Sequence, residues 1–265
     1  MTKAKVSATK RILNCLPSKK TEYDWRPAAA RAAGVMAAAA APPAKVDLRA
    51  AWWAIGDQGQ TGSCVGWASA DSVLRWHFVK AGHISKTESL SVRFAWMAAK
   101  ETDEFTTAPT TFIEADGTSL KAALDIARKY GAVKDKVLPF GSATLFPGEV
   151  DEFYAMAANL KIASYFNLGI NLPTWRRWLA ANGPILTRLN CDDTWMNAKA
   201  TNGVLATYNA ATADGGHAVA LVGYDPNGFI VRNSWGTSNW GDKGFAYASN
   251  AYAAAAFTEA YGIAL

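Results

Sequence analysis

The chain has 265 residues, of which 50% are hydrophobic and 18% are charged, with 11 Trp and three Cys. This composition excludes a disordered, collagen-like or coiled-coil chain, and three cysteines are too few for a disulfide framework. The net charge of +5 is concentrated in residues 1–43, which carry +6, so the remaining residues are close to neutral at −1. We therefore expect no broad nucleic-acid-binding surface.

Residues 1–43 are predicted to form a leader in front of a globular domain over residues 44–265. Within the leader, Ile12–Arg26 contains apolar anchors and two aromatic residues, whereas Ala32–Ala41 is mostly alanine and is predicted to be a flexible linker. We find neither the apolar core of a secretory signal nor a run of about 18 apolar residues that would span a membrane. The sequence leaves open whether the protein stays in the cytoplasm or is exported by another route.

The period of the apolar residues changes along the domain. Helical spacing predicts helices at Cys64–Lys80, Ser91–Lys100, Ser119–Lys129 and Pro173–Asn182. Short apolar runs between Gly, Asn, Asp and Pro clusters predict strands at Ile185–Leu189, His217–Tyr224, Gly228–Asn233 and Phe245–Ala248. The pattern indicates an α+β fold with a helical lobe, a β-rich lobe and a cleft between them.

Cys64 stands at the start of the first predicted helix, directly after the turn GDQGQTGS. The unpaired N–H groups of a helix start and the positive end of its dipole stabilise a thiolate, so they lower the pKa of a cysteine there. We therefore expect Cys64 to be a nucleophile, although a lone cysteine is more often a buried core residue.

Three further residues could complete a catalytic site around Cys64. His217 begins one apolar strand and Asn233 ends the next, so neighbouring antiparallel strands would bring the imidazole and the amide together. Asn233 would then fix the tautomer of His217, which serves as the base. Gln58 precedes the cysteine by six residues, and its amide could donate to an oxyanion together with the Cys64 N–H.

Three blocks in this order resemble the papain-like cysteine peptidases: QGQTGSCVGWAS, GGHAVALVGYD and FIVRNSWGTSNWGDKGF. The gaps from Cys64 to His217 and to Asn233, 153 and 169 residues, are close to the spacing usual in the family. The resemblance extends from about Lys45 to the C-terminus. It implies a papain-like two-lobed fold and an endopeptidase that forms a thioester on the cysteine, acts on a peptide or protein substrate, and needs no metal or cofactor.

The resemblance also implies roles for four residues outside the catalytic set. Trp235 would shield the His217–Asn233 pair from water, and Trp240 would line the primed side of the cleft. Gly117 would belong to the glycine wall along which the substrate backbone pairs. Arg188 would lie near the main side-chain pocket and favour an acidic or polar group, with an arginine that points to solvent as the alternative.

The chain departs from the usual family pattern at several positions. The residue after the nucleophile is Val65 rather than Trp, and Thr61 replaces a cysteine that commonly forms a disulfide. One extra residue precedes the second Trp of NSWGTSNWG, and the long helical prodomain is missing. These features resemble the bacterial branch of the family.

Several alternatives stay open at the level of sequence. The same site could serve a transpeptidase or a dedicated processing enzyme, or the chain could be a non-catalytic scaffold that binds peptides. Cys15 and Cys191 could be free thiols or a pair, and His77 and His83 are interpreted as structural or solvent-facing. Ile12–Arg26 could lie in the cleft and block it as an inhibitory segment, or strap the outside of the β-rich lobe, with the alanine-rich linker open to proteolysis.

Overall fold

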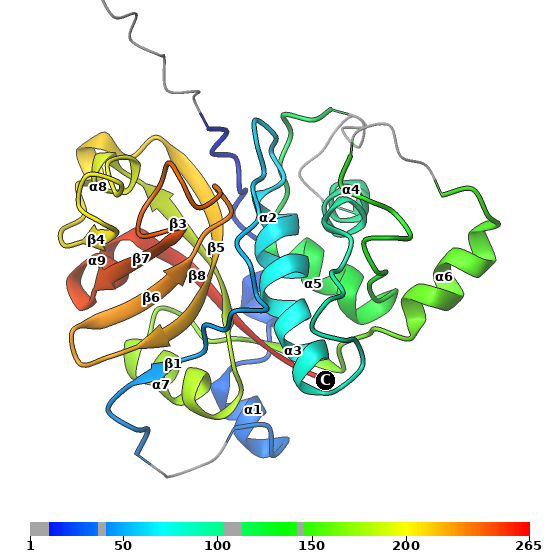
Figure 1. The fold of residues 1–265 in the computed structure, drawn as a ribbon. Coiled ribbons are helices and arrows are strands. Elements are labelled where there is room, and N and C mark those ends of the chain that lie inside the picture. The colour runs from blue at the N-terminus through cyan, green and yellow to red at the C-terminus, as the bar shows by residue number, and fades with distance from the viewer. Residues whose placement is uncertain (1–10, 37–40, 103–112, 142–145) are drawn as a thin grey trace, which may run out of the picture.

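The computed structural model describes residues 11–36, 41–102, 113–141 and 146–265, which form a helical lobe and a β-rich lobe side by side (Figure 1). The α+β class expected from the sequence is confirmed. The helices are α1 (Pro27–Ala32), α2 (Cys64–Gly66), α3 (Arg75–Lys80), α4 (Val92–Thr102), α5 (Leu120–Lys129), α6 (Val150–Ala158), α7 (Leu172–Ala181), α8 (Asp193–Met196) and α9 (Asn250–Ala256). The strands are β1 (Val46–Asp47), β2 (Ser164–Asn167), β3 (Ile185–Cys191), β4 (Val204–Leu205), β5 (Gly215–Tyr224), β6 (Gly228–Arg232), β7 (Phe245–Ser249) and β8 (Phe257–Ala264).

The helical lobe is built around one long helix that starts at Cys64. Helix α2 continues without a break through a π-helical stretch, Trp67–Leu74, into α3, so the predicted helix Cys64–Lys80 is confirmed. The π-helical stretch is buried from Ala68 onward, which places the long helix in the middle of the protein rather than on its surface. Within the described residues, no helix has both the length and the apolar character needed to cross a membrane.

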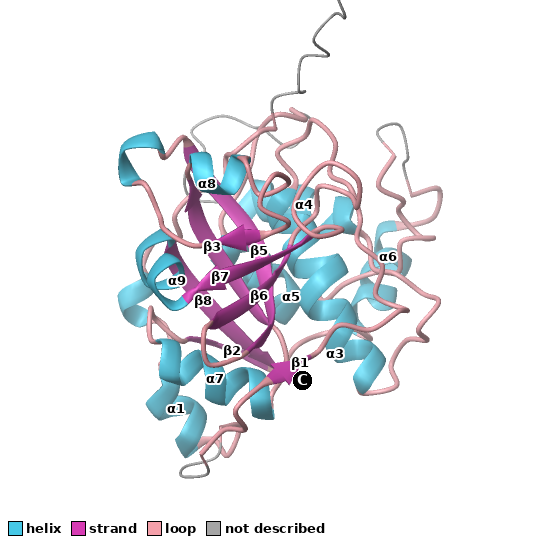
Figure 2. Cartoon of the chain, turned by 60° about the vertical axis from the view of Figure 1, so that its left-hand side comes forward, coloured by secondary structure: helices cyan, strands magenta, loops and turns pink. Residues whose placement is uncertain are grey.

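The β-rich lobe holds one twisted sheet with the strand order β2-β8-β3-β5-β6-β7-β4, to which β1 adds by pairing with β5 (Figure 2). The pairings are antiparallel except for β4 with β7. Strand β5 is buried along almost its whole length, as its unbroken apolar sequence GHAVALVGY requires. The four predicted strands are confirmed to within two residues, whereas β2, β8 and α6 were not predicted.

Helix α1 was not predicted from the sequence; it reaches Ala32, the first residue of the predicted linker Ala32–Ala41, in which Met36 is buried rather than free. Pro27–Ala32 forms helix α1, and Ala30 and Met36 are buried against the β-rich lobe. Proline at the first helical position and the alanine run that follows favour a helix once the apolar face of that helix has a partner. The rest of the linker prediction, over residues 37–40, lies outside the described residues.

A buried ionic network joins the two lobes directly behind the end of β6. Arg232 is 1% exposed, and its guanidinium contacts the Asp71 carboxylate of the long helix at 2.8 Å and the Ser72 hydroxyl at 2.5 Å. Arg75 contacts the other oxygen of Asp71 at 3.2 Å. Because Arg232 directly precedes Asn233, this network fixes the end of β6 against the helix that carries Cys64.

Candidate active site

Cys64 lies fully buried at the first turn of the long helix, where the sequence analysis placed it. Its sulfur faces strand β5 of the other lobe, where the Ala218 backbone N–H and the His217 side chain both stabilise its thiolate form. The helix start and the strand β5 thus meet at this thiol.

His217 and Asn233 are brought together as predicted. They end up side by side because β5 and β6 pair antiparallel, and the Nε2 of His217 is 2.7 Å from the Oδ1 of Asn233. Among the described residues, the Nδ1 of His217 has no hydrogen-bond partner of nitrogen or oxygen. One ring nitrogen is therefore held by the amide, while the other is left to interact with Cys64.

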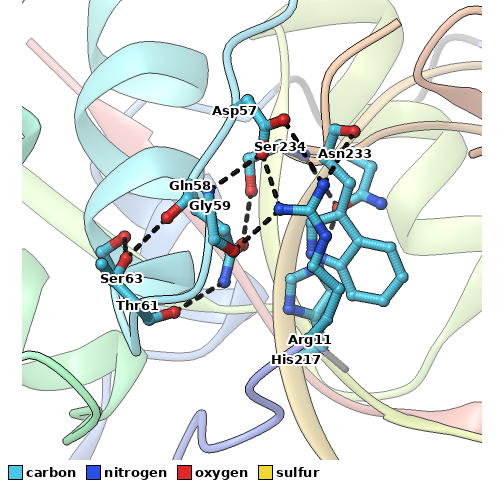
Figure 3. A network of polar contacts seen from close by, with 10 residues as sticks. Arg11, Asp57, Gln58, Gly59, Thr61, Ser63, His217, Asn233 and Ser234 are labelled. Carbon is cyan, nitrogen blue, oxygen red and sulfur yellow. Dashed lines mark hydrogen bonds and ion pairs between the residues drawn. The ribbon is translucent and has the colours of Figure 1, made fainter. Parts of the chain in front are cut away.

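Gln58 is fully buried beside this pair, on the loop that leads to Cys64 (Figure 3). Its backbone N–H donates to the Ser234 carbonyl at 2.9 Å, and its Oε1 accepts from the Ser234 hydroxyl at 2.9 Å. The Nε2 of Gln58 donates to the Thr61 carbonyl at 3.0 Å. Sequence reasoning found Gln58 but missed Ser234, which holds the glutamine amide from the opposite lobe.

Three tryptophan rings cover the His217–Asn233 pair. The Trp235 ring centre lies 4.9 Å from that of His217, and the Trp195 ring centre lies 5.6 Å from it. Trp240 is 2% exposed, packs on Trp195 at 4.5 Å, and donates from its indole nitrogen to the Trp195 carbonyl at 2.9 Å. The His217 imidazole is fully buried, with the Trp235 and Trp195 rings directly against it and Trp240 behind them.

Trp195 was missed by sequence reasoning. It lies on α8, the short helix after β3, whose start is capped by the buried Asp192 through the Trp195 N–H at 3.0 Å. The same carboxylate accepts from the Tyr252 hydroxyl at 2.7 Å. The capping pattern CDDTW was a usable signal for a helix start, but nothing in it indicates that the ring reaches His217.

The N-terminal segment Arg11–Leu16 runs through the site. Asn14 pairs with Gly216 next to His217 and donates from its side chain to the Ala115 carbonyl on the other lobe. The Cys15 N–H donates to the Gly216 carbonyl at 2.9 Å. The Leu16 N–H donates to the Thr118 carbonyl at 3.0 Å, so the segment is bonded to both lobes.

Arg11 holds the front end of this segment against the active-site loops (Figure 3). Its guanidinium forms an ion pair with Asp57 at 2.6 Å and donates to the Gly59 carbonyl at 2.8 Å. It also lies 5.7 Å from the Trp235 ring centre, within range of a cation–π contact. Asp57 directly precedes Gln58, so Arg11 reaches the loop that carries the candidate oxyanion donor.

The later part of Ile12–Arg26 follows the strap alternative instead. Asp24 forms an ion pair with Lys121 at 2.7 Å, and its other oxygen accepts from Asn167 and Tyr261 at 2.9 and 2.8 Å. The Trp25 ring packs on Phe166 at 6.0 Å. The residues Arg11–Leu16 therefore contact the candidate site, whereas Asp24 and Trp25 are anchored outside it.

Cys15 interacts directly with Cys64. The pKa of Cys64 lies well below that of an ordinary thiol because the Cys15 thiol, and after it His217 and the Ala218 N–H, stabilise the thiolate against the effect of burial. Burial and the neighbouring Cys64 raise the pKa of Cys15 well above its ordinary value. The two shifts favour a thiolate at Cys64 and a protonated thiol at Cys15.

Two of the candidate substrate-binding residues also contact the segment. A side chain on Gly117 would collide with the Asn14 carbonyl. Arg188 is 8% exposed, so the alternative of an arginine pointing to solvent is wrong. Its Nε donates to the Cys15 carbonyl at 2.9 Å and its Nη1 to the Thr258 hydroxyl at 2.7 Å.

The remaining titratable candidates lie apart from this site. His77 is buried in α3, where desolvation lowers its pKa to about 4 despite a hydrogen bond to the Pro184 backbone. His83 is exposed and stacks on Phe78.

None of the three cysteines, all of which lie in the described residues, is in a disulfide, so Cys15 and Cys191 are free thiols. In the described ranges, no three His, Cys, Asp or Glu residues cluster as metal ligands.

Comparison with protein families gives a match over most of the chain. The model of the family described as papain family cysteine protease matches residues 42–263. The matched region contains all four candidate catalytic residues and begins after helix α1, so the segment Arg11–Leu16 lies outside it.

Individual relatives are distant. The chain is 30% identical to cysteine proteinase B of Leishmania mexicana over 40% of its own length and 24% of that protein, and 29% identical to cathepsin B-like CP2 of Giardia intestinalis over 44% and 41%. The match thus spans less than half of the length of each of these two relatives. Among solved structures, xylellain, a cysteine protease from Xylella fastidiosa, superposes with a TM-score of 0.76 at 21% identity, covering 98% of this chain and 99% of that one.

Proposed function

The chain belongs to the papain family of cysteine proteases, and we propose on that basis that it is an endopeptidase that hydrolyses peptide bonds through a thioester on Cys64. The observation that carries the proposal is the set of contacts around the Cys64 sulfur. The Cys15 thiol, the His217 imidazole and the Ala218 N–H act on it at the start of the long helix, and they hold the pKa of the thiol well below its ordinary value.

The acylation step follows from this arrangement. The Cys64 thiolate attacks the peptide carbonyl carbon, and the imidazolium of His217 gives its proton to the leaving amine. Asn233 keeps the ring oriented throughout by the 2.7 Å hydrogen bond to Nε2. A water molecule deprotonated by His217 then attacks the thioester and regenerates the thiolate.

The oxyanion formed in both steps needs donors that are already in place. The backbone N–H of Cys64 at the helix start is one, and the side-chain amide of Gln58 is the other. Ser234 and Thr61 hold that amide at 2.9 and 3.0 Å, so little reorganisation is needed when charge develops on the substrate oxygen.

A fluorogenic peptide assay tests the proposal. Cys64→Ala is expected to abolish turnover while leaving the fold intact, because alanine suits a helix start. Cys191→Ala provides the matched control, since it removes another fully buried free cysteine, one that lies on β3 and has no role in the proposed mechanism. Full activity in Cys64→Ala, or a peptide that is bound but never cleaved by the wild type, would favour the binding-scaffold alternative.

We further propose that Arg11–Leu16 inhibits the enzyme of which it is a part. Its backbone bonds to Gly216 and Thr118 occupy the groups that a substrate strand would use. The family resemblance places Trp240 on the primed, leaving-group side of the cleft and Gly117 in the glycine wall along which the substrate backbone pairs, and Trp235 packs on Trp240 with ring centres 5.8 Å apart. Arg11 lies at Trp235 and Leu16 at Thr118, so the segment runs opposite to a substrate, which favours an inhibitor over a cleavable peptide.

Arg188 is proposed to shape the subsite exposed when the segment leaves. Its Nε bond to the Cys15 carbonyl would be broken, while the Nη1 bonds to Thr258 and Asn190 would keep the guanidinium in place. A fixed cation with a freed Nε–H donor favours an acidic or polar substrate group. A peptide library that shows the same preference for the wild type and Arg188→Ala would refute this role.

A further inference from the structure

The inhibitory segment brings a second sulfur to the nucleophile. Cys15 is 2% exposed and Cys64 is fully buried, and both belong to one buried cluster at the junction of the lobes. Hydrogen bonds on either side of Cys15 fix its backbone: its N–H donates to the Gly216 carbonyl at 2.9 Å, and its carbonyl accepts from Arg188 at 2.9 Å. The Cys15 thiol is thus held beside the Cys64 thiol, with which it interacts.

We propose that Cys15 and Cys64 form a redox pair, in which a hydroperoxide converts the two thiols to a disulfide that locks the N-terminal segment in the active site and protects the nucleophile. The inference rests on the proposed inhibition by this segment. It adds that a hydroperoxide makes the inhibition covalent and that reduction of the disulfide reverses it. The proposal makes Cys15 a site of oxidative modification. Peptide hydrolysis itself does not need a cysteine at this position.

The chemistry balances in two steps. The Cys64 thiolate attacks one oxygen of the hydroperoxide, the O–O bond breaks, and Cys64 becomes a sulfenic acid while an alcohol, or water from hydrogen peroxide, leaves after taking up a proton. The Cys15 sulfur then attacks the sulfenic sulfur, so that an S–S bond forms and the S–O bond breaks. The hydroxide takes the Cys15 proton and leaves as water, so two electrons pass from the two thiols to the peroxide.

The two thiols are suited to these unequal roles. Oxidation follows thiolate character and exposure, and since both thiols are almost equally buried, the lower pKa of Cys64 makes it the sulfur that reacts first. Cys15 has a raised pKa because of burial and of the Cys64 charge beside it. Once Cys64 is a neutral sulfenic acid that charge is gone, and Cys15 is more readily deprotonated to resolve it.

The third cysteine is a built-in comparison. Cys191 ends β3 and is fully buried, and burial raises the pKa of its thiol well above the ordinary value. Strand pairing holds it opposite Gly215, within the sheet rather than on the N-terminal segment. It is therefore expected to stay reduced when the Cys15–Cys64 pair oxidises.

The experiment treats the full chain with a small excess of hydrogen peroxide, blocks remaining thiols with iodoacetamide, and maps disulfides by mass spectrometry without reduction. A peptide linking Cys15 to Cys64 is expected in the wild type and in Cys191→Ala, and dithiothreitol should release it. In Cys15→Ser, Cys64 should instead pass to the sulfinic or sulfonic acid, which dithiothreitol does not reverse.

Two results would overturn the inference. One is wild-type protein in which Cys15 and Cys64 are each alkylated or overoxidised separately, with no linked peptide. The other is equal overoxidation of Cys64 in the wild type and in Cys15→Ser. Because the linked peptide is read without substrate, a chain that forms it but fails to cleave peptides would contradict the proposed function and leave the redox pair standing.

Discussion

The Ser234 hydroxyl donates to the Gln58 Oε1 at 2.9 Å, and this bond joins the two lobes beside the nucleophile. Ser234 follows the candidate catalytic Asn233, and Gln58 lies on the loop that leads to Cys64. The donor that would stabilise the oxyanion is therefore positioned by the same turn that orients the imidazole.

Removal of this donor should slow catalysis without weakening substrate binding. Gln58→Ala is expected to lower kcat by about 10²–10³ because the oxyanion loses one donor, with KM nearly unchanged. Ser234→Ala should lower kcat less, by roughly tenfold, because the glutamine amide remains but is less well held. The exposed Ser85 provides the matched control as Ser85→Ala. A change confined to KM in Gln58→Ala would contradict the assigned role.

Weakening of the N-terminal segment should activate the enzyme. The double variant Arg11→Ala/Asn14→Ala loses the ion pair to Asp57 and the bond to the Ala115 carbonyl, and no catalytic residue is changed. Turnover of a fluorogenic peptide is expected to rise about tenfold, the factor that corresponds to ~1.4 kcal/mol of lost contact energy.

The control for that comparison is Arg31→Ala, an exposed arginine of α1 away from the site. A chain that begins at Lys45 provides a second test, because added Ile12–Arg26 peptide should inhibit it. Equal turnover of the double variant and the wild type, together with no inhibition by the peptide, would rule out an inhibitory segment.

The buried network between the lobes should be essential for stability. Asp71→Asn leaves the guanidinium groups of Arg232 and Arg75 without their shared carboxylate, at 2.8 and 3.2 Å in the wild type. We expect the free energy of unfolding to fall by about 3–5 kcal/mol in urea titrations. In contrast, Asp125→Asn changes a half-exposed pair with Arg128 and keeps an oxygen that can accept from the Tyr165 hydroxyl, so it should cost less than about 1 kcal/mol. Similar losses for the two variants would contradict this account of the network.

The lowered pKa of the buried His77 should make the protein less stable in mild acid. Its pKa is about 4 in the folded protein, below the ~6.5 of an unfolded chain. The unfolded state therefore binds more protons between these values, so the free energy of unfolding falls as the pH decreases from about 6.5 to about 4. The full effect of this group is of the order of 3 kcal/mol.

Urea titrations across that pH range, on the wild type, His77→Gln and the exposed-residue control His83→Gln, measure the contribution of His77. The wild type and His83→Gln should lose stability in parallel, whereas His77→Gln should lose distinctly less. Parallel curves for all three proteins would show that His77 does not titrate as described.

The sequence predicted the structure best where one short pattern determines the position of a side chain. The apolar strands around His217 and Asn233, and the turn before Cys64, sufficed to predict which side chains meet, because antiparallel pairing leaves few arrangements for neighbouring strands. The site roles themselves stay predictions until the variants above are measured.

Contacts made by irregular backbone could not be predicted in the same way. Cys15 meets Cys64 because the segment bonds to Gly216 and Thr118, and neither contact has a local sequence signal. Helix α1 forms because the β-rich lobe buries Ala30, although an alanine run by itself is equally compatible with a linker. Both outcomes depend on packing between residues that are far apart in the chain.

The central claim is that Cys64 forms the acyl intermediate, and trapping that intermediate tests it most directly. The wild type and the Arg11→Ala/Asn14→Ala variant are mixed with an activated ester of a short peptide, quenched in acid and mapped by mass spectrometry. The acyl group is expected on Cys64 in both proteins, to a greater extent in the variant, and to be absent when Cys64→Ala is introduced. An acyl group on another residue, or turnover that persists unchanged in Cys64→Ala, would contradict the account.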